Sequence, residues 1–160
     1  MKVSRISKYD TSNWSGINTS VFFTGCTHNC PGCFNDNIQD FEEGVEFDRE
    51  LEDILFDFLD DKYVMGLCIL GGEPFQQDMS ILYRVVYKAK VVSHKPVHIW
   101  SGYTYEELQE IPGAKDVLRY CDTLVDGRFD ITKKDLSLKF RGSSNQRILK
   151  LNKGEIVNED

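Results

Sequence analysis

Three cysteines lie within eight residues of this chain, in the stretch C-T-H-N-C-P-G-C from Cys26 to Cys33. Three residues separate Cys26 from Cys30, and two separate Cys30 from Cys33. Cysteine thiolates hold iron–sulfur clusters, and closely spaced cysteines on a tight loop can bind several corners of one cubane. Three thiolates leave one iron of a [4Fe–4S] cluster without a protein ligand. The spacing therefore predicts a cluster with an open iron, which suggests chemistry rather than electron storage alone.

Two other uses of these thiols must be weighed. A structural zinc site prefers four ligands, commonly as two close pairs of cysteine or histidine. His28 lies inside the loop, but no second pair follows it. The other cysteines and histidines are scattered along the chain: Cys68, His94, His98 and Cys121. A disulfide framework is also disfavoured, because five cysteines are an odd number and 160 residues can bury a core without crosslinks.

Two further motifs follow apolar stretches that predict strands. G-G-E-P, from Gly71 to Pro74, comes after Met65–Leu70, a run typical of a strand buried on both faces. Its two glycines let the backbone approach a ligand closely, although taken alone the tetrapeptide is more typical of an ordinary turn. Ser101 and Gly102 follow the apolar run Val97–Trp100. Because α/β folds place ligands at strand ends, we expect these motifs on the same rim as the cysteine loop.

The elements that must position these motifs alternate along the chain. Strands are predicted at Ser20–Phe23, Met65–Leu70, Val97–Trp100, Thr123–Val125 and Ile148–Leu151. Helices are predicted after Asp48, from about Met79 to Val91, and after Thr104, which forms a capping box with Glu107. This alternation predicts an α/β fold with a mainly parallel sheet and right-handed crossovers. Five or so strands are too few for a full barrel, so an open partial (βα) barrel fits better.

The two ends of the chain give weaker signals. The polar lead from Lys2 to Gly16 is assigned no strand, and the tail from Gly154 to Asp160 is expected to be frayed. The length predicts a single domain, residues 1–160. Met1–Asp10 lacks the apolar centre of a signal peptide, and free thiols are typical of the reducing cytoplasm, where we expect the protein.

Charge and hydropathy disfavour nucleic acid and membrane as partners. The net charge of −7 disfavours general nucleic-acid binding, which needs a basic face for the phosphates. No apolar run approaches the ~20 residues that span a bilayer, so no membrane segment is expected.

The cysteine spacing is similar to the signature of the radical S-adenosylmethionine (SAM) superfamily. More narrowly, T-G-C-T-H-N-C-P-G-C-F-N, from Thr24 to Asn35, resembles the activating proteins of anaerobic ribonucleotide reductases. G-G-E-P, W-S-G-Y-T and V-D-G-R-F followed by R-G-S-S-N-Q-R strengthen the match and extend it to about Ile148. Many superfamily members have an aromatic residue before the third cysteine. Here Gly32 precedes Cys33 and Phe34 follows it, a pattern that the narrower family shares.

The resemblance implies a set of roles. Cys26, Cys30 and Cys33 would bind three irons, and the fourth iron would chelate the amino and carboxylate groups of SAM. The G-G-E-P motif would bind the methionine end of SAM, and the residues around Cys33 would flank its adenine. The expected cofactor contacts are Gly32, Cys33, Phe34, Gly71, Gly72, Glu73, Pro74 and Ser101. No side chain is assigned as a general acid or base.

The implied activity is that of a glycyl-radical-generating activase. A reduced cluster, supplied with electrons by a flavodoxin or a thiol system, would cleave SAM into methionine and a 5′-deoxyadenosyl radical. That radical would remove a hydrogen atom from a glycine of the large reductase subunit. Arg141–Arg147 would dock this polypeptide or hold the cofactor's carboxylate, a group that suits arginine. The alternatives are an activase of the pyruvate formate-lyase type and a non-enzymatic zinc or electron-transfer module.

Overall fold

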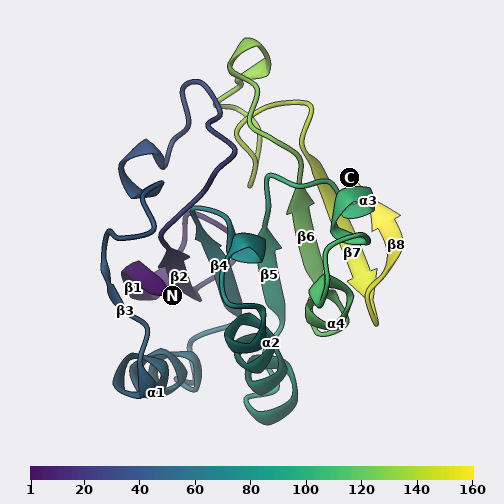
Figure 1. The fold of residues 1–160 in the computed structure, drawn as a ribbon. Coiled ribbons are helices and arrows are strands. Elements are labelled where there is room, and N and C mark those ends of the chain that lie inside the picture. Colours follow the sequence, from purple (N-terminus) through teal and green to yellow (C-terminus); the bar gives the residue numbers. More distant parts are fainter.

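One eight-stranded sheet runs through the molecule (Figure 1). The structure is a computed structural model that describes residues 1–160. Its strands are β1 (Lys2–Asp10), β2 (Asn18–Phe23), β3 (Val45–Glu46), β4 (Leu67–Gly71), β5 (Val97–Trp100), β6 (Thr123–Asp126), β7 (Arg147–Asn152) and β8 (Glu155–Glu159). They lie in the order β3-β1-β2-β4-β5-β6-β7-β8. All five predicted strands are therefore present.

The four central strands β2, β4, β5 and β6 pair in parallel, whereas the strands at both edges pair antiparallel. In the centre, Val21 lies beside Ile69, and Ile69 lies beside Ile99. All three are fully buried, as expected of parallel strands. The predicted α/β class is confirmed, but the prediction of a mainly parallel sheet is wrong. The sheet is mixed, with parallel pairing confined to its centre.

The C-terminal tail forms an antiparallel edge strand rather than a frayed end. Lys153 and Gly154 connect β7 to β8 as a two-residue turn with φ of 52° and 86°. Two left-handed residues are typical of the tight hairpin turn whose twist matches that of the flanking strands. Every residue of β8 is exposed, so its sequence lacks the apolar pattern by which a buried strand is predicted. Backbone pairing and the turn, rather than burial, hold this strand in place.

The polar lead contains the second unpredicted edge strand, β1. It pairs with β2 on one side and with the two-residue β3 on the other. Only Val3 is buried among its nine residues. An antiparallel edge strand can leave most of its side chains in water, and this removes the hydrophobic pattern by which strands are recognised.

The helices are α1 (Arg49–Leu59), α2 (Met79–Tyr87), α3 (Tyr105–Leu108) and α4 (Ala114–Leu118). A π-helical turn, Lys88–Val92, continues α2, so the predicted helix from Met79 to Val91 is confirmed. The Asp48 carboxylate caps α1 by accepting a hydrogen bond from the Leu51 amide, and the capping box of Thr104 and Glu107 is present at α3. None of the helices combines the length and apolar character needed to cross a membrane.

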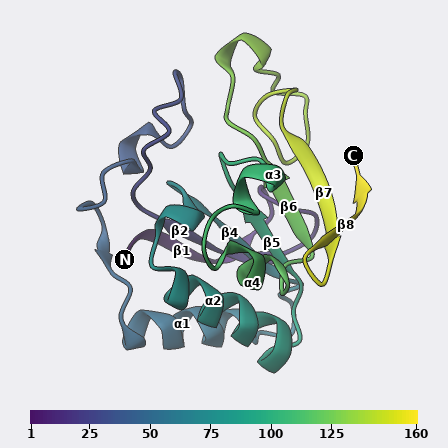
Figure 2. The same cartoon turned by 45° about the vertical axis from the view of Figure 1, so that its right-hand side comes forward.

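The two faces of the sheet are covered differently. Figure 2 shows α1, α2 and α4 together on one face, and 25 buried residues form the core on that side. On the other face the buried cluster has only four members: Phe22, Ile38, Cys68 and Leu70. Trp14 and Trp100 pack against this smaller cluster. Because loops rather than helices cover the second face, it has room for a cavity.

We expect Leu55→Ala to destabilise the protein strongly. Leu55 is fully buried in the core between α1 and the sheet, and such truncations cost about 2–5 kcal/mol of unfolding free energy. Leu136→Ala is the matched control, because Leu136 is 81% exposed and its loss should change stability by less than about 0.5 kcal/mol. Urea denaturation of the cluster-free protein measures both values. Equal losses in the two variants would contradict the assigned core.

Candidate functional site

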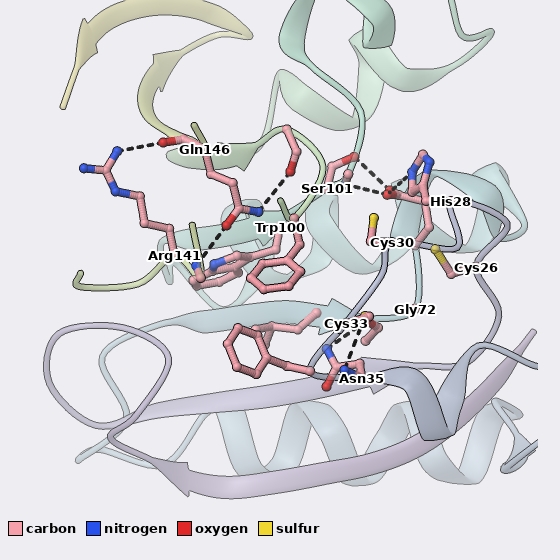
Figure 3. Close-up of a pocket in the computed structure, with 18 of the residues that line it drawn as sticks. Cys26, His28, Cys30, Cys33, Asn35, Gly72, Trp100, Ser101, Arg141 and Gln146 are labelled. Atoms are coloured by element: carbon pink, nitrogen blue, oxygen red, sulfur yellow. Dashed lines mark hydrogen bonds and ion pairs between the residues drawn. The ribbon is translucent and has the colours of Figure 1, made fainter. Parts of the chain in front are cut away.

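The three sequence motifs meet at the carboxyl ends of the parallel strands, around one cavity (Figure 3). The cysteine loop follows β2, G-G-E-P follows β4, and Ser101–Gly102 follows β5. The cavity has a volume of about 430 Å³, within the range of small-molecule and cofactor sites. Eight predicted site residues line it: Cys26, Cys30, Cys33, Phe34, Gly71, Gly72, Glu73 and Ser101. Two predicted cofactor contacts, Gly32 and Pro74, are not part of its wall.

The three loop cysteines are half-buried free thiols that share this cavity. No group of three or more cysteine, histidine, aspartate or glutamate side chains is arranged to hold a single metal ion. A mononuclear zinc site would need its ligands to converge on one point. In a cubane, each thiolate binds a different iron, so three thiols that line one cavity fit a cluster. The remaining thiols, Cys68 and Cys121, are buried in the core as small apolar groups.

Burial controls the protonation of the loop thiols. It raises the pKa of Cys26 to about 11 and also raises the pKa of Cys30. Both thiols are therefore protonated at neutral pH when no metal is bound. Thiolate is the form that binds metal, so iron binding must release these protons.

The backbone at the start of the cysteine loop is hydrogen-bonded to the segment that follows the loop. The amides of Gly25 and Cys26 donate to the carbonyls of Ile38 and Gln39, each at 2.9 Å. Asn29, at the centre of the loop, has a φ of 52°, a left-handed conformation that asparagine tolerates better than most residues. These contacts give the loop a defined shape within the protein itself.

The two glycines of G-G-E-P allow two strand ends to approach each other closely. A Cβ atom on Gly71 would lie 2.1 Å from the carbonyl oxygen of Phe23, and one on Gly72 would lie 2.2 Å from that of Gly25. The Gly72 amide donates to Phe23 at 2.7 Å, and the Glu73 amide donates to Gly25 at 2.8 Å. Glycine is therefore required here by the protein's own backbone, in addition to any ligand.

The carboxylate of Glu73 is fully buried, and four donors surround it. One oxygen accepts from the Phe75 amide and the Ser101 hydroxyl, at 3.1 and 2.8 Å. The other lies 2.7 Å from the Gly102 amide and 3.0 Å from Nε2 of His28. Figure 3 shows this network beside the cysteine loop. The polar groups of Glu73 and Ser101 thus bind one another at the edge of the cavity.

The cavity also has an apolar wall, whose role was not predicted from the sequence. Phe22, Leu70, Trp100 and Phe140 line it, and the Trp100 indole donates to the Phe140 carbonyl at 2.7 Å. Within β5, Trp100 packs on the helix-free side of the sheet, whereas Ile99 belongs to the core on the helical side. The alternation was visible in the sequence. The sequence did not indicate, however, that one face of the sheet would remain free of helices.

The segment Arg141–Arg147 divides into two parts. The Arg147 guanidinium binds Asp126 at 2.9 and 2.5 Å and Glu106 at 2.7 Å, and these carboxylates raise its pKa further. Arg147 is therefore bound to these carboxylates and does not line the cavity. Arg141 lines the cavity, but its guanidinium donates to the Gln146 carbonyl and points away from the cysteines in Figure 3. Arg147 is therefore occupied by protein carboxylates, whereas Arg141 is part of the cavity wall.

We expect alkylation to separate the five thiols into two groups. In the native, cluster-free protein, iodoacetamide should label the three loop cysteines, whereas Cys68 and Cys121 should react only after unfolding in urea, because both are buried. Labelling of Cys26 should accelerate about tenfold per pH unit below its raised pKa of about 11, because only the thiolate reacts. Peptide mass spectrometry measures each rate. Native labelling of Cys68 as fast as that of Cys26 would contradict this burial pattern.

Comparisons with known proteins agree with this site. The family model described as "4Fe-4S single cluster domain" matches residues 12–149. A protein of Pasteurella multocida (strain Pm70) is 36% identical over 143 residues, which cover 87% of this chain and 90% of the relative. A protein of Enterobacteria phage T4 is 31% identical over 152 residues, covering 92% and 93%. Both are named anaerobic ribonucleoside-triphosphate reductase-activating protein, and by this similarity the chain belongs to the family of anaerobic ribonucleoside-triphosphate reductase-activating proteins.

Proposed function

We propose that this protein activates an anaerobic ribonucleotide reductase by reductive cleavage of SAM at a [4Fe–4S] cluster, which leads to a glycyl radical on the large reductase subunit. The observation that carries the proposal is the meeting of the cysteine loop, G-G-E-P and Ser101 at one cavity. The names of the relatives and the description of the matching family support the reductase as partner and iron–sulfur chemistry as the means.

The loop thiols would hold the cluster. Cys26, Cys30 and Cys33 would bind three irons and leave the fourth open toward the cavity. When bound, the cluster supplies the electron that breaks a carbon–sulfur bond of SAM, and so provides the radical that removes hydrogen from glycine. The protein's own contribution is to bind, orient and protect these groups. No side chain of the site is required to act as a general acid or base.

The wall of the cavity would orient SAM. The Gly72 carbonyl accepts none of the loop or side-chain hydrogen bonds, so it can accept one from the amino group of SAM. Phe34 is 54% exposed, its ring centroid lies 5.0 Å from that of Phe129, and both residues line the cavity. This aromatic pair would flank the adenine of SAM. The apolar surfaces of Phe22, Leu70 and Trp100 would keep water from a reactive radical.

The domain, the shape of its sheet and its partners complete the proposal. We propose that residues 1–160 form one radical SAM domain whose sheet is an open partial barrel, with the cavity on its concave side. The helix-free face would then admit the glycine-bearing segment of the reductase. A cytoplasmic flavodoxin or thiol system would supply the electron, and nucleic acid would play no part.

We expect Cys30→Ala to abolish SAM cleavage, because the cluster would lose one of its three protein ligands. Cys68→Ala is the matched control, since Cys68 is a buried thiol with no place in the loop, and cleavage should continue. Chromatography of methionine and 5′-deoxyadenosine after reduction with dithionite measures the activity. Normal cleavage by Cys30→Ala would overturn the cluster assignment.

Low-temperature electron paramagnetic resonance tests the open iron directly. The anaerobically reconstituted, dithionite-reduced protein should give a [4Fe–4S]⁺ signal whose shape changes when SAM is added. A silent spectrum together with stoichiometric zinc in the same sample would mean that the loop is a structural metal site, and the catalytic proposal would fail.

The partner is tested by offering the reduced protein and SAM to two purified apo-enzymes. A glycyl radical signal should form on the large subunit of an anaerobic ribonucleotide reductase and not on a pyruvate formate-lyase. The opposite result would mean that the protein activates a glycyl radical enzyme of the pyruvate formate-lyase type.

A further inference from the structure

The residues between the first two loop cysteines are held by side chains from the segment that follows β4. We define this segment, Gly71–Gln77, as the cradle. It continues the G-G-E-P motif through Phe75, Gln76 and Gln77. Two of its side chains contact the cysteine loop and a third contacts the residues just before Cys26, although loop and cradle lie more than forty residues apart in the chain.

The first attachment joins Glu73 of the cradle to His28 of the loop. Nε2 of His28 lies 3.0 Å from the buried Glu73 carboxylate, and the His28 side chain is only 6% exposed. The imidazole packs edge-on to the Tyr103 ring, with centroids 4.5 Å apart. A Cβ atom on Gly102 would lie 2.5 Å from the imidazole, so glycine is the residue that leaves room for it. His28 is thus enclosed by protein groups.

The second attachment joins Gln76 to Thr27. The side-chain oxygen of Gln76 accepts from the Thr27 amide at 2.8 Å, and its nitrogen donates to the Thr27 hydroxyl at 2.8 Å. The same nitrogen donates to the Tyr103 hydroxyl at 2.9 Å. Gln77 adds a third attachment just before Cys26, by donating to the carbonyls of Thr24 and Gly25 at 2.8 and 3.2 Å.

These contacts give the residues between the cysteines a role of their own. The ring nitrogen of His28 that faces the protein is occupied by Glu73, and both polar atoms of the Gln76 amide are occupied by the loop and Tyr103. A loop that is already ordered loses less conformational entropy when it binds a ligand, so it binds more readily. Sites whose ligating side chains are supported in this way also keep a tighter geometry.

We propose that Glu73 and Gln76 are positioning residues, which hold Thr27 and His28 so that the cysteine loop is ordered before any cluster is bound. In this role His28 is an attachment point and not an iron or zinc ligand. The inference rests on the proposed function only for the identity of what the thiols bind. Whether the loop is ordered without a cluster can be tested independently of the proposed function.

Hydrogen exchange of the full chain without its cluster tests the attachment of Thr27. In the wild-type protein the Thr27 amide should be protected, and Gln76→Leu should raise its exchange rate on the order of tenfold, as expected for the loss of a hydrogen-bonded attachment. Amides of β5 should change little. Gln109→Leu is the control, because it removes the same side-chain amide from a residue that donates to the Tyr105 carbonyl and has no hydrogen bond to the loop.

Two results would overturn the proposal at this step. One is exchange of the wild-type Thr27 amide at the rate of an unstructured peptide, and the other is an unchanged rate in Gln76→Leu. Neither result involves SAM or the reductase, so it is distinguishable from a failure of the proposed function.

The His28 attachment is tested by a conservative rescue. His28→Leu should slow cluster reconstitution several-fold and broaden the paramagnetic resonance signal of the reduced cluster. His28→Gln should restore both, because the glutamine amide nitrogen can donate to Glu73 as Nε2 does. Iron and sulfide content and the line shape are the measurements. If both variants lose the cluster equally, His28 is a metal ligand and the proposal is wrong.

Discussion

The arrangement of the site depends on one buried carboxylate, that of Glu73. A carboxylate removed from water is costly unless donors replace its lost hydration. Here four donors do so, and they come from the cysteine loop, from the cradle itself and from the residues after β5. Satisfying the charge therefore forces three segments, each following a different parallel strand, to meet at one place. The cavity lies where they meet.

The backbone imposes a second constraint in the same place. The ends of β2 and β4 lie so close that a side chain on Gly71 or Gly72 would collide with carbonyl oxygens of the neighbouring segment. This close contact brings the peptide groups of the G-G-E-P motif alongside the cysteine loop. Motifs that resemble separate ligand contacts in the sequence are thus one connected structure, in which the glycines and the glutamate also support the loop.

The difference between the two faces of the sheet gives the site its space. Helices α1, α2 and α4 cover one face and bury most of the apolar residues there. Along β5, alternate residues point to opposite faces, so Ile99 enters the core while Trp100 lines the cavity. Since all the longer helices lie on one side, the other side is left to loops, and a pocket with an apolar wall results.

The central strands, the capped helices, the cysteine loop and the motifs at the strand ends were predictable from the sequence, because each has a strong local pattern. The sequence did not reveal β1 or β8, whose side chains are mostly exposed and whose pairing depends on a neighbouring strand and a tight turn. Only the tertiary structure showed that Arg147 binds Asp126 and Glu106 instead of facing the cavity. Likewise, only the structure placed His28 against Glu73, and Thr27 against Gln76. The physical reason is the same in each case: a polar side chain takes the partner that folding brings within hydrogen-bond distance, and the spacing of residues along the chain does not contain that distance.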